Sequence, residues 1–171
     1  GILPPHGRLV TMLNWVYRHE PSAEATRMQA FRVREFVRAG SAEQVLAWRG
    51  VWLLRAQELL RSLQLAATAE VAADPFFGRG GRMLAQTQRE HKLKYELLIP
   101  VNCEAQPTAV CSFNYHQQHF GSTFEIAGAG GEAAHTACLG FGLERVTMAL
   151  FRAHGFEAGS WPRAVRQRLW P

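Results

Sequence analysis

The sequence predicts an α+β domain in which helices pack on an antiparallel sheet. Residues 9–20 and 27–38 both alternate apolar with polar side chains and flank a short polar loop, residues 21–26, as expected for an antiparallel hairpin. Further short apolar segments follow, separated by turn residues and by two stretches with helical spacing. The chain has 171 residues, enough for one domain with a sizeable core, so we expect a single domain over residues 1–171.

The first helix has the clearest start signal. Residues 41–44 read Ser-Ala-Glu-Gln, a capping box, and apolar residues that include Trp48 and Trp52 then keep helical spacing to about residue 64. A second, short helix is predicted over residues 82–91, after a turn-rich segment that begins at Asp74.

The remaining strands and helices follow from alternation and from turn residues. Strands are predicted at residues 68–73, 92–101 (stopped by Pro100), 108–115, 122–127 and 132–139, with a glycine turn at residues 128–131. A helix is predicted over residues 140–155 with Gly155 at its end, and a basic tail helix has Pro162 in its first turn.

Composition narrows the function classes only partly. The formal net charge is +5, and Lys92 and Lys94 are the only lysines among 19 basic residues. An arginine excess suits phosphate binding but also a GC-rich genome, and the basic charge permits either nucleic acid or an acidic protein as partner. No stretch resembles a membrane span or a signal peptide, so the cytoplasm is the expected location and no membrane partner is expected.

The three cysteines, Cys103, Cys111 and Cys138, are too few for a disulfide framework. Each is expected to be a buried small apolar residue. His116 and His119 form an H-x-x-H spacing, which fits either a metal pair or two polar loop histidines.

The predicted hairpin carries polar residues where a core face would be expected. Arg18 and Glu20 share one face of the first strand, and Phe31 and Glu35 share one face of the second. Such a set can bind a nucleotide, since arginine neutralises phosphate and an aromatic ring stacks on a base. A surface hairpin with an Arg–Glu pair and one core phenylalanine is the alternative.

A second candidate segment is "GFGLER", residues 140–145. Gly140 and Gly142 lie where a strand is expected to turn into a helix, with Arg145 on the first turn, and a glycine-rich helix N-terminus favours anions. The alternative is a tight strand–helix corner with a solvated arginine. The spacing is not a dinucleotide fingerprint, because Arg145 replaces the third glycine.

Together these segments resemble motifs 2 and 3 of the class II aminoacyl-tRNA synthetases, and the resemblance covers residues 14–155. "YRHE" resembles the F-R-x-E of motif 2, and "HTACLGFGLERVTMAL" resembles the seryl-type motif 3. The stretches "TRMQAFRVREFVRAG", "DPFFGRGGRMLA" and "SFNYHQQHFG" resemble the amino acid:[carrier protein] ligases, truncated relatives of the zinc-dependent seryl-tRNA synthetases. That family activates a small amino acid with ATP and passes it to the phosphopantetheine thiol of a carrier protein.

The resemblance implies roles in ATP binding for residues of the hairpin. Arg18 would contact the α-phosphate and Glu20 the adenine or ribose side of ATP. Arg27 and Met28 would hold the β- and γ-phosphates, and Phe31 would stack on adenine.

It also implies roles for residues of the later strands. Arg145 would close on the other adenine face or on the γ-phosphate, which makes Arg18 and Arg145 the expected catalytic residues. Less specifically, Lys94 and the backbone of Ala109, Val110 and Cys111 would border the ATP site.

Zn²⁺ is the metal that the resemblance implies, and Mg²⁺ is expected on chemical grounds as the partner of ATP phosphates. Glu35 and Cys138 would be zinc ligands, with the substrate amine filling an open position near Glu35. Magnesium would accompany ATP, with Glu96 and Glu125 as candidate ligands. A further upstream Cys and motif 1 are absent from the chain, so it resembles the C-terminal part of the catalytic domain, and the complete protein is expected to be a homodimer.

Three functions are consistent with these motifs. The first is ATP-dependent activation of glycine or alanine and transfer to a carrier protein, with no tRNA partner. The second is a fragment of a seryl-type tRNA synthetase, and the third is a non-catalytic nucleotide-binding paralogue.

Overall fold

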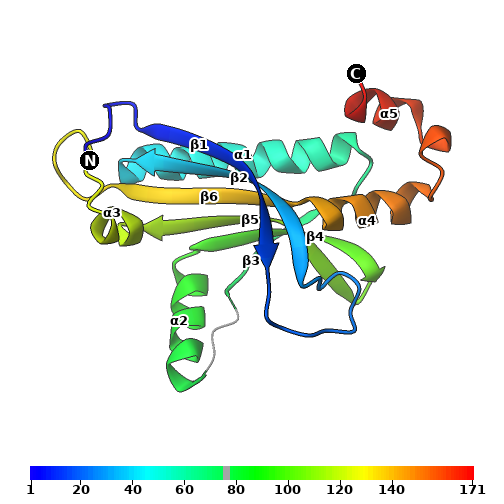
Figure 1. The fold of residues 1–171 in the computed structure, drawn as a ribbon, viewed down its shortest axis with the longest axis horizontal. Helices are drawn as coiled ribbons and strands as arrows, with labels where there is room; N and C mark the ends of the chain where they lie inside the picture. Colours follow the sequence, from blue (N-terminus) through cyan, green and yellow to red (C-terminus); the bar gives the residue numbers. More distant parts are fainter. Residues whose placement is uncertain (75–77) are drawn as a thin grey trace.

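The structure, a computed structural model, describes residues 1–74 and 78–171, with the side chains of residues 78–82 and 84 left aside. A six-stranded antiparallel sheet in the order β1-β2-β6-β5-β4-β3 forms its centre (Figure 1). The elements are β1 (Arg8–Tyr17), β2 (Ala30–Gly40), α1 (Ala42–Ser62), β3 (Thr68–Val71), α2 (Gly78–Glu90), β4 (Lys94–Cys103), β5 (Gln106–Gln117), α3 (His119–Thr123), β6 (His135–Gly142), α4 (Leu143–His154), the 3₁₀ turn η1 (Ala158–Ser160) and α5 (Arg163–Leu169). The predicted antiparallel sheet with flanking helices is confirmed.

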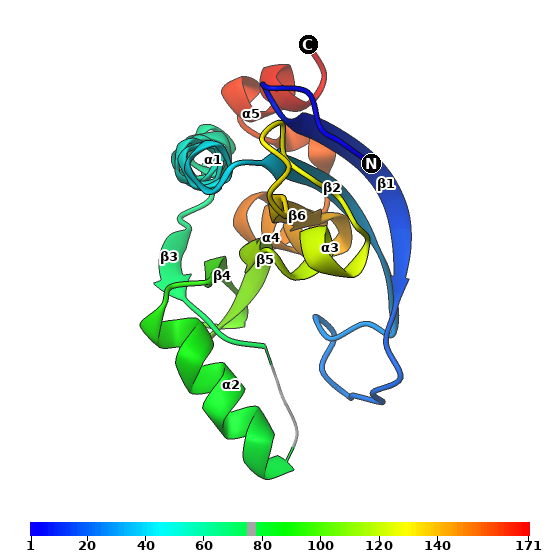
Figure 2. The same cartoon turned by 90° about the vertical axis from the view of Figure 1, so that its left-hand side faces the viewer.

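One face of the sheet is covered by helices. Leu97, Phe113 and Leu139, on neighbouring strands, are fully buried against Ala56 of α1 and Leu150 of α4. Figure 2 shows α1 and α4 on this side of the curved sheet, while α2 extends away from it. None of the helices in the described part of the chain is long and apolar enough to cross a membrane.

The predicted capping box and tryptophan stripe of α1 are both present. The Ser41 hydroxyl accepts from the Gln44 N–H, and the Gln44 side chain accepts from the Ser41 N–H, each at 3.2 Å. Trp48 and Trp52 are partly buried against the core, and Trp52 stacks on Phe36 of β2 at 5.6 Å between ring centroids. The helix therefore reaches the sheet through its aromatic stripe.

Strand ends differ from the prediction at the hairpin. β1 ends at Tyr17 and β2 begins at Ala30, so Arg18, Glu20 and Arg27 lie in a connection rather than in strands. The Arg18 N–H still donates to the Gln29 carbonyl at 2.7 Å, which continues the pairing by one step.

The boundary between β6 and α4 also moves. The strand continues through Gly142, three residues beyond the prediction, and Arg145 keeps its predicted place on the first turn of the helix. Pairing with β2 explains the extension, because Glu35 lies opposite Gly140 and Val33 opposite Gly142.

Two strand predictions are wrong in detail. Residues 122–127 do not form a strand: residues 119–123 form the short helix α3, and its turn continues as the Phe124 N–H donates to the Phe120 carbonyl. In this segment the local i to i−4 hydrogen bonds outweigh the β propensity of the residues. Glu125, which follows, has a positive φ of 51°. Pro100 does not stop β4, because the register with β5 is irregular between Ile99 and Cys103, and a proline is tolerated at such a bulge.

Helix limits shift as well. α2 begins at Gly78, four residues earlier than predicted, and the turn expected across residues 75–77 lies outside the described residues. Pro162 is the N-cap of α5 rather than a residue of its first turn.

The packing predicts a large stability difference between two phenylalanines. Phe113→Ala should lower the free energy of unfolding by about 3–5 kcal/mol, because the side chain is fully buried between α1 and the sheet. Phe156→Ala, at a residue 84% exposed, should change it by less than about 0.5 kcal/mol. Urea unfolding followed by circular dichroism measures both, and equal losses would contradict this assignment of the core.

Candidate functional site

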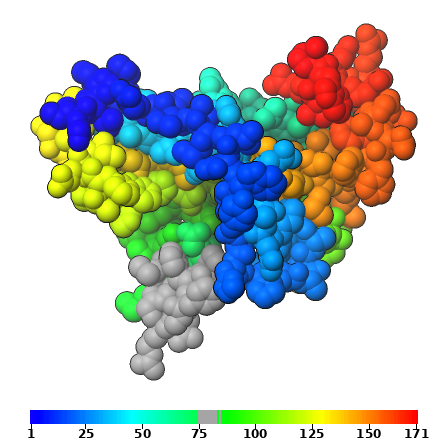
Figure 3. All heavy atoms as spheres, in the orientation of Figure 1, coloured from blue at the N-terminus to red at the C-terminus, as the bar shows by residue number. Residues whose placement is uncertain are grey.

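Two adjoining cavities open on the sheet face that the helices leave uncovered. The smaller, of about 250 Å³, lies over β2, β6 and β5, and the larger, of about 590 Å³, lies toward the connection between β1 and β2. That connection, residues 18–29, extends below the sheet at the front of the molecule (Figures 1 and 3). Arg18, Lys94, Glu96, Ala109 and Arg145 line both cavities, so the two form one continuous site.

Register explains why this face is open and polar. Alternate residues of a strand share a face, and pairing of β2 with β6 and β5 places Glu35, Gly140 and Ser112 side by side. The glycine has no side chain to fill the space, and an added Cβ would meet the Val33 Cγ1 at 3.0 Å. The smaller cavity therefore exists because Gly140 occupies its floor.

Arg145 joins three parts of the site. Its Nε donates to the Thr26 carbonyl at 2.8 Å, and its Nη1 donates to the Ala109 carbonyl at 2.9 Å. Burial lowers the pKa of Arg145, and the neighbouring Arg18 lowers it further, although at neutral pH the guanidinium remains charged. The first turn of α4 is thus fastened both to the hairpin connection and to β5.

The hairpin side of the site holds the other predicted nucleotide residues. The guanidinium of Arg18 lies over the Phe31 ring, 5.0 Å from its centroid. Glu20 and Arg27 form an ion pair and both line the larger cavity. Met28 is half-buried, but it is not among the described residues that line either cavity.

A second contact that anchors α4 was not predicted from the sequence. The Glu144 carboxylate accepts from the Arg32 backbone N–H at 2.8 Å and from the Arg32 Nε at 2.9 Å. Although partial burial opposes it, these hydrogen bonds hold the pKa of Glu144 below its usual value. The segment "GLER" could have indicated such a contact, because an acidic residue precedes Arg145 at the predicted helix start.

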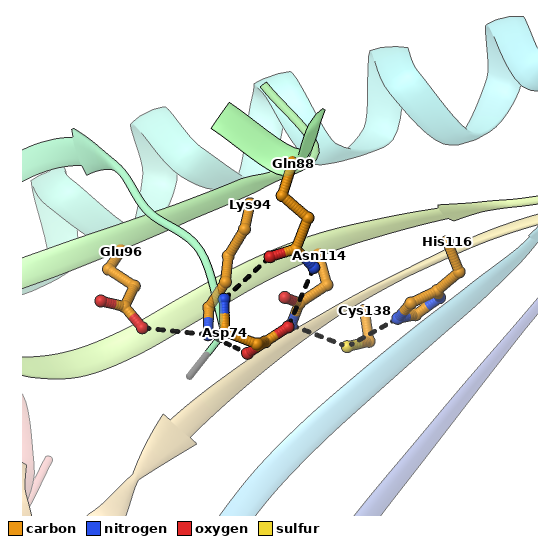
Figure 4. Close-up of polar contacts among 7 residues, drawn as sticks. All are labelled: Asp74, Gln88, Lys94, Glu96, Asn114, His116 and Cys138. Carbon is orange, nitrogen blue, oxygen red and sulfur yellow. Dashed lines mark hydrogen bonds and ion pairs between the residues drawn. The ribbon is translucent and has the colours of Figure 1, made fainter. Parts of the chain in front are cut away.

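A polar network fixes Lys94 at the place where the cavities meet (Figure 4). Its Nζ lies 2.5 Å from the Asp74 Oδ1 and 3.2 Å from the Glu96 Oε1. Burial works against the charge of Lys94, but the two carboxylates raise its pKa above the usual value. Asp74 was not predicted, because it follows β3 and only the fold brings it to β4.

Glu35 and Cys138 lie on the same sheet face, as their registers opposite Gly140 and Val37 require. Around the thiol, the Asn114 Nδ2 is 3.5 Å and the His116 Nε2 is 3.6 Å from the Cys138 Sγ (Figure 4). Burial raises the pKa of Cys138 to about 12, the Asn114 hydrogen bond opposes this rise, and the Glu35 carboxyl adds to it.

The side chains of Glu35 and Cys138 supply part of the ligand set that a zinc site needs. A thiol and a carboxyl are both suitable zinc ligands, and they lie together on one face. In residues 1–74 and 78–171, however, no group of three or more His, Cys, Asp or Glu side chains is arranged to hold a metal ion.

The two histidines of the H-x-x-H spacing have different partners. The His116 Nδ1 bonds to the Thr136 hydroxyl at 3.0 Å, while the His119 ring packs against Phe120 at 5.0 Å.

Cys111 and Cys103 also have different surroundings. Cys111 is buried in the core and lines the smaller cavity beside Val110. Cys103 is exposed, contrary to the expectation that all three cysteines are buried, because it lies at the irregular end of β4.

Comparison with known proteins supports the resemblance. No protein-family profile matches the chain. The chain is 50% identical over 169 residues to amino acid–[acyl-carrier-protein] ligase 2 of Bradyrhizobium diazoefficiens, covering 99% of the chain and 51% of that protein. It is 46% identical to ligase 1 of the same organism, covering 52% of it. The chain therefore spans about half the length of these relatives.

More distant relatives are tRNA ligases. A type-2 serine–tRNA ligase of Methanococcus aeolicus is 30% identical, with 95% of the chain and 32% of that protein aligned. A seryl-tRNA synthetase of Methanopyrus kandleri, solved with a tRNA, superposes with a TM-score of 0.79 and 25% identity over 98% of the chain and 34% of that protein.

A second solved structure shows the same fold at lower identity. The seryl-tRNA synthetase of Pyrococcus horikoshii, solved with ATP, has a TM-score of 0.71 and 14% identity over 98% of the chain and 39% of that protein. The resemblance to carrier-protein ligases and class II synthetases, predicted from the motifs, is confirmed.

The cysteine environments predict a ranked order of alkylation in the metal-free chain. Iodoacetamide at pH 8 should modify exposed Cys103 first, and Cys138 at least about 100-fold more slowly, because only thiolate reacts and burial holds the Cys138 pKa at about 12. Peptide mass spectrometry over time measures the rates, and urea should make them similar. Equal rates in the folded chain would contradict the described environment of Cys138.

Proposed function

We propose that the protein uses ATP to activate a small amino acid, glycine or alanine, and transfers it to the phosphopantetheine thiol of a carrier protein. The observation that carries the proposal is the site itself: cations gather at one end of a continuous cavity, Glu35 lines its other end, and Cys138 lies on the same sheet face as Glu35. Two relatives named as amino acid–[acyl-carrier-protein] ligases align with nearly the whole chain, which supports this chemistry.

ATP is proposed to lie along the larger cavity. Arg18 and Arg27 are placed to contact its phosphates, with Lys94 and Arg145 at the border with the smaller cavity. Phe31 offers a ring for the adenine, while Glu20 and the backbone of Ala109, Val110 and Cys111 border the base and ribose. Magnesium would neutralise further charge on the phosphates, and Glu96, which lines the cavity, would help to hold it.

The amino acid is proposed to occupy the Glu35 end of the smaller cavity, while the base of ATP reaches across the border to Phe31 at the other end of that cavity. Zinc held by Glu35 and Cys138, with a further ligand, would offer an open coordination position for the substrate amine. Val33 and Gly140 bound a volume of about 250 Å³, which supports a small side chain.

The reaction requires little beyond positioning and charge. The substrate carboxylate is already a nucleophile, so its oxygen bonds to the α-phosphorus as the bond to pyrophosphate breaks, with no general base. Arg18 and Arg145 stabilise the negative charge that develops, and both are held before substrate arrives. In the second step the carrier thiol attacks the carbonyl carbon and AMP leaves.

The second candidate is a tRNA-charging protein of the seryl type, supported by the aligned type-2 serine–tRNA ligases. A nucleotide-binding paralogue without catalysis is the third, and the partial donor set for zinc supports it. A homodimeric assembly and a cytoplasmic location stay predictions.

The molecule that accepts the activated amino acid distinguishes these candidate functions. With ATP, labelled glycine or alanine, holo-carrier protein and total tRNA, label should appear on the carrier and not on tRNA. Arg18→Ala and Arg145→Ala should each lower transfer by at least about 100-fold, because each removes a charge that stabilises the transition state. Arg55→Ala, on α1 and against Trp52, should leave it unchanged.

Three other results would each contradict the proposal differently. Label on tRNA with none on the carrier would favour the second candidate. ATP binding without amino-acid-dependent pyrophosphate exchange would favour the third. Wild-type transfer by both arginine variants would overturn the assignment of the ATP site.

Zinc binding tests the other end of the cavity. Cys138→Ser should lower zinc affinity by at least about ten-fold, since a thiolate ligand is lost, whereas Cys103→Ser should not. Competition with a chromophoric chelator measures affinity, and cobalt substitution should show a sulfur-to-metal charge-transfer band only while Cys138 is present. A band that survives Cys138→Ser would exclude this ligand.

A further inference from the structure

Helix α2 reaches the site at one point. It extends away from the sheet in both ribbon views (Figures 1 and 2). Near its end, however, Gln88 bonds to Asp74, and the next residue, Arg89, lines the larger cavity together with Asp74 and Lys94. The helix therefore contributes to the cavity wall through its last turn.

The contact between Gln88 and Asp74 is two-way. The Asp74 N–H donates to the Gln88 Oε1 at 2.8 Å, and the Gln88 Nε2 donates to the Asp74 Oδ2 at 3.0 Å. The other carboxylate oxygen, Oδ1, receives the Lys94 ammonium at 2.5 Å (Figure 4). Gln88 thus occupies one oxygen of Asp74 and directs the second toward Lys94.

Lys94 depends on this arrangement because it is only 9% exposed. A buried ammonium needs compensating charge, which comes from Asp74 and from Glu96. Glu96 is two residues along the same strand and is fixed by the sheet, whereas Asp74 lies in the segment after β3 and is oriented by α2. Of these two partners, Asp74 is therefore the one whose position α2 can change.

We propose that Gln88 and Asp74 are positioning residues. Through them, the position of α2 determines the position of the Lys94 ammonium in the nucleotide cavity. The role in nucleotide binding rests on the proposed function, but the coupling to Lys94 does not. Loss of the Gln88 amide leaves Asp74 free to turn away, so Lys94 loses its nearer counter-charge and moves from the border between the cavities.

The chain offers a direct readout, since Lys92 and Lys94 are its only lysines. Trace acylation with acetic anhydride, followed by peptide mass spectrometry, gives the rate at Lys94 relative to exposed Lys92 in the same molecule. Only the unprotonated amine reacts. Release from Asp74 removes the ion pair and exposes the largely buried Lys94 amine to the reagent, so acylation becomes faster.

Variants of Gln88 separate the coupling from a general effect on the helix. Gln88→Ala should raise the Lys94-to-Lys92 ratio about three-fold, in the range for loss of an ion pair. Gln88→Glu, which keeps an acceptor for the Asp74 N–H but loses the donor, should do the same, and Asp74→Asn should raise the ratio at least as much. The control is Gln86→Ala, because Gln86 bonds only to Glu90 of its own helix, at 2.6 Å, among its described side-chain contacts.

Calorimetric titration with ATP and magnesium gives the second readout. Gln88→Ala should weaken binding about two- to ten-fold, the range for loss of one hydrogen bond, while Gln86→Ala should not. A wild-type labelling ratio in both Gln88 variants overturns the coupling, and so does an equal rise in the Gln86 variant. A raised ratio with unchanged ATP affinity overturns the role in nucleotide binding. If the unaltered protein binds no ATP, the proposed function fails, and the coupling is decided by the labelling ratio.

Discussion

The antiparallel pairing of β2 with β6 is the constraint on which the rest of the structure depends. Because the pairing sets Glu35 opposite Gly140 and Val37 opposite Cys138, it decides which side chains face the open side of the sheet. A slip of one residue would turn these groups toward the helices and place aromatic and aliphatic residues in the cavity. The same pairing carries β6 into α4, so it also sets the position of Arg145 on the first turn of that helix.

The charged groups of the site are held by partners within the chain itself. Two main-chain carbonyls hold Arg145, two carboxylates hold Lys94, and a backbone N–H together with a guanidinium holds Glu144. Groups arranged in advance need little reorganisation when charge develops, and such electrostatic stabilisation is usually the largest single contribution to enzyme catalysis. Folding therefore supplies most of the order that phosphate chemistry at this site would need.

Local signals predicted the hairpin, the capped helix and the glycine-rich strand-to-helix corner, because each depends on neighbouring residues. The motifs likewise indicated Arg18, Phe31 and Arg145, all of which line the cavities. What could not be predicted is contact between distant segments: Asp74 and Gln88 meet Lys94 only through the fold, as Glu144 meets Arg32. The helix at residues 119–123 was missed because its aromatic and β-branched residues favour a strand when tertiary context is unknown.

The order of the strands has a consequence for how the chain folds. β1 and β2 form one hairpin, and β3, β4, β5 and β6 form a second unit of neighbouring strands; within the sheet the two units meet where β2 pairs with β6. About a hundred residues separate β2 from β6 along the chain. Forming the β2–β6 pairing, the seam between the two units, therefore carries a large entropic cost and should limit the folding rate. Since the cavities lie across the seam, neither half has a site before the halves dock, and a partly folded chain has no pocket in which to hold a nucleotide.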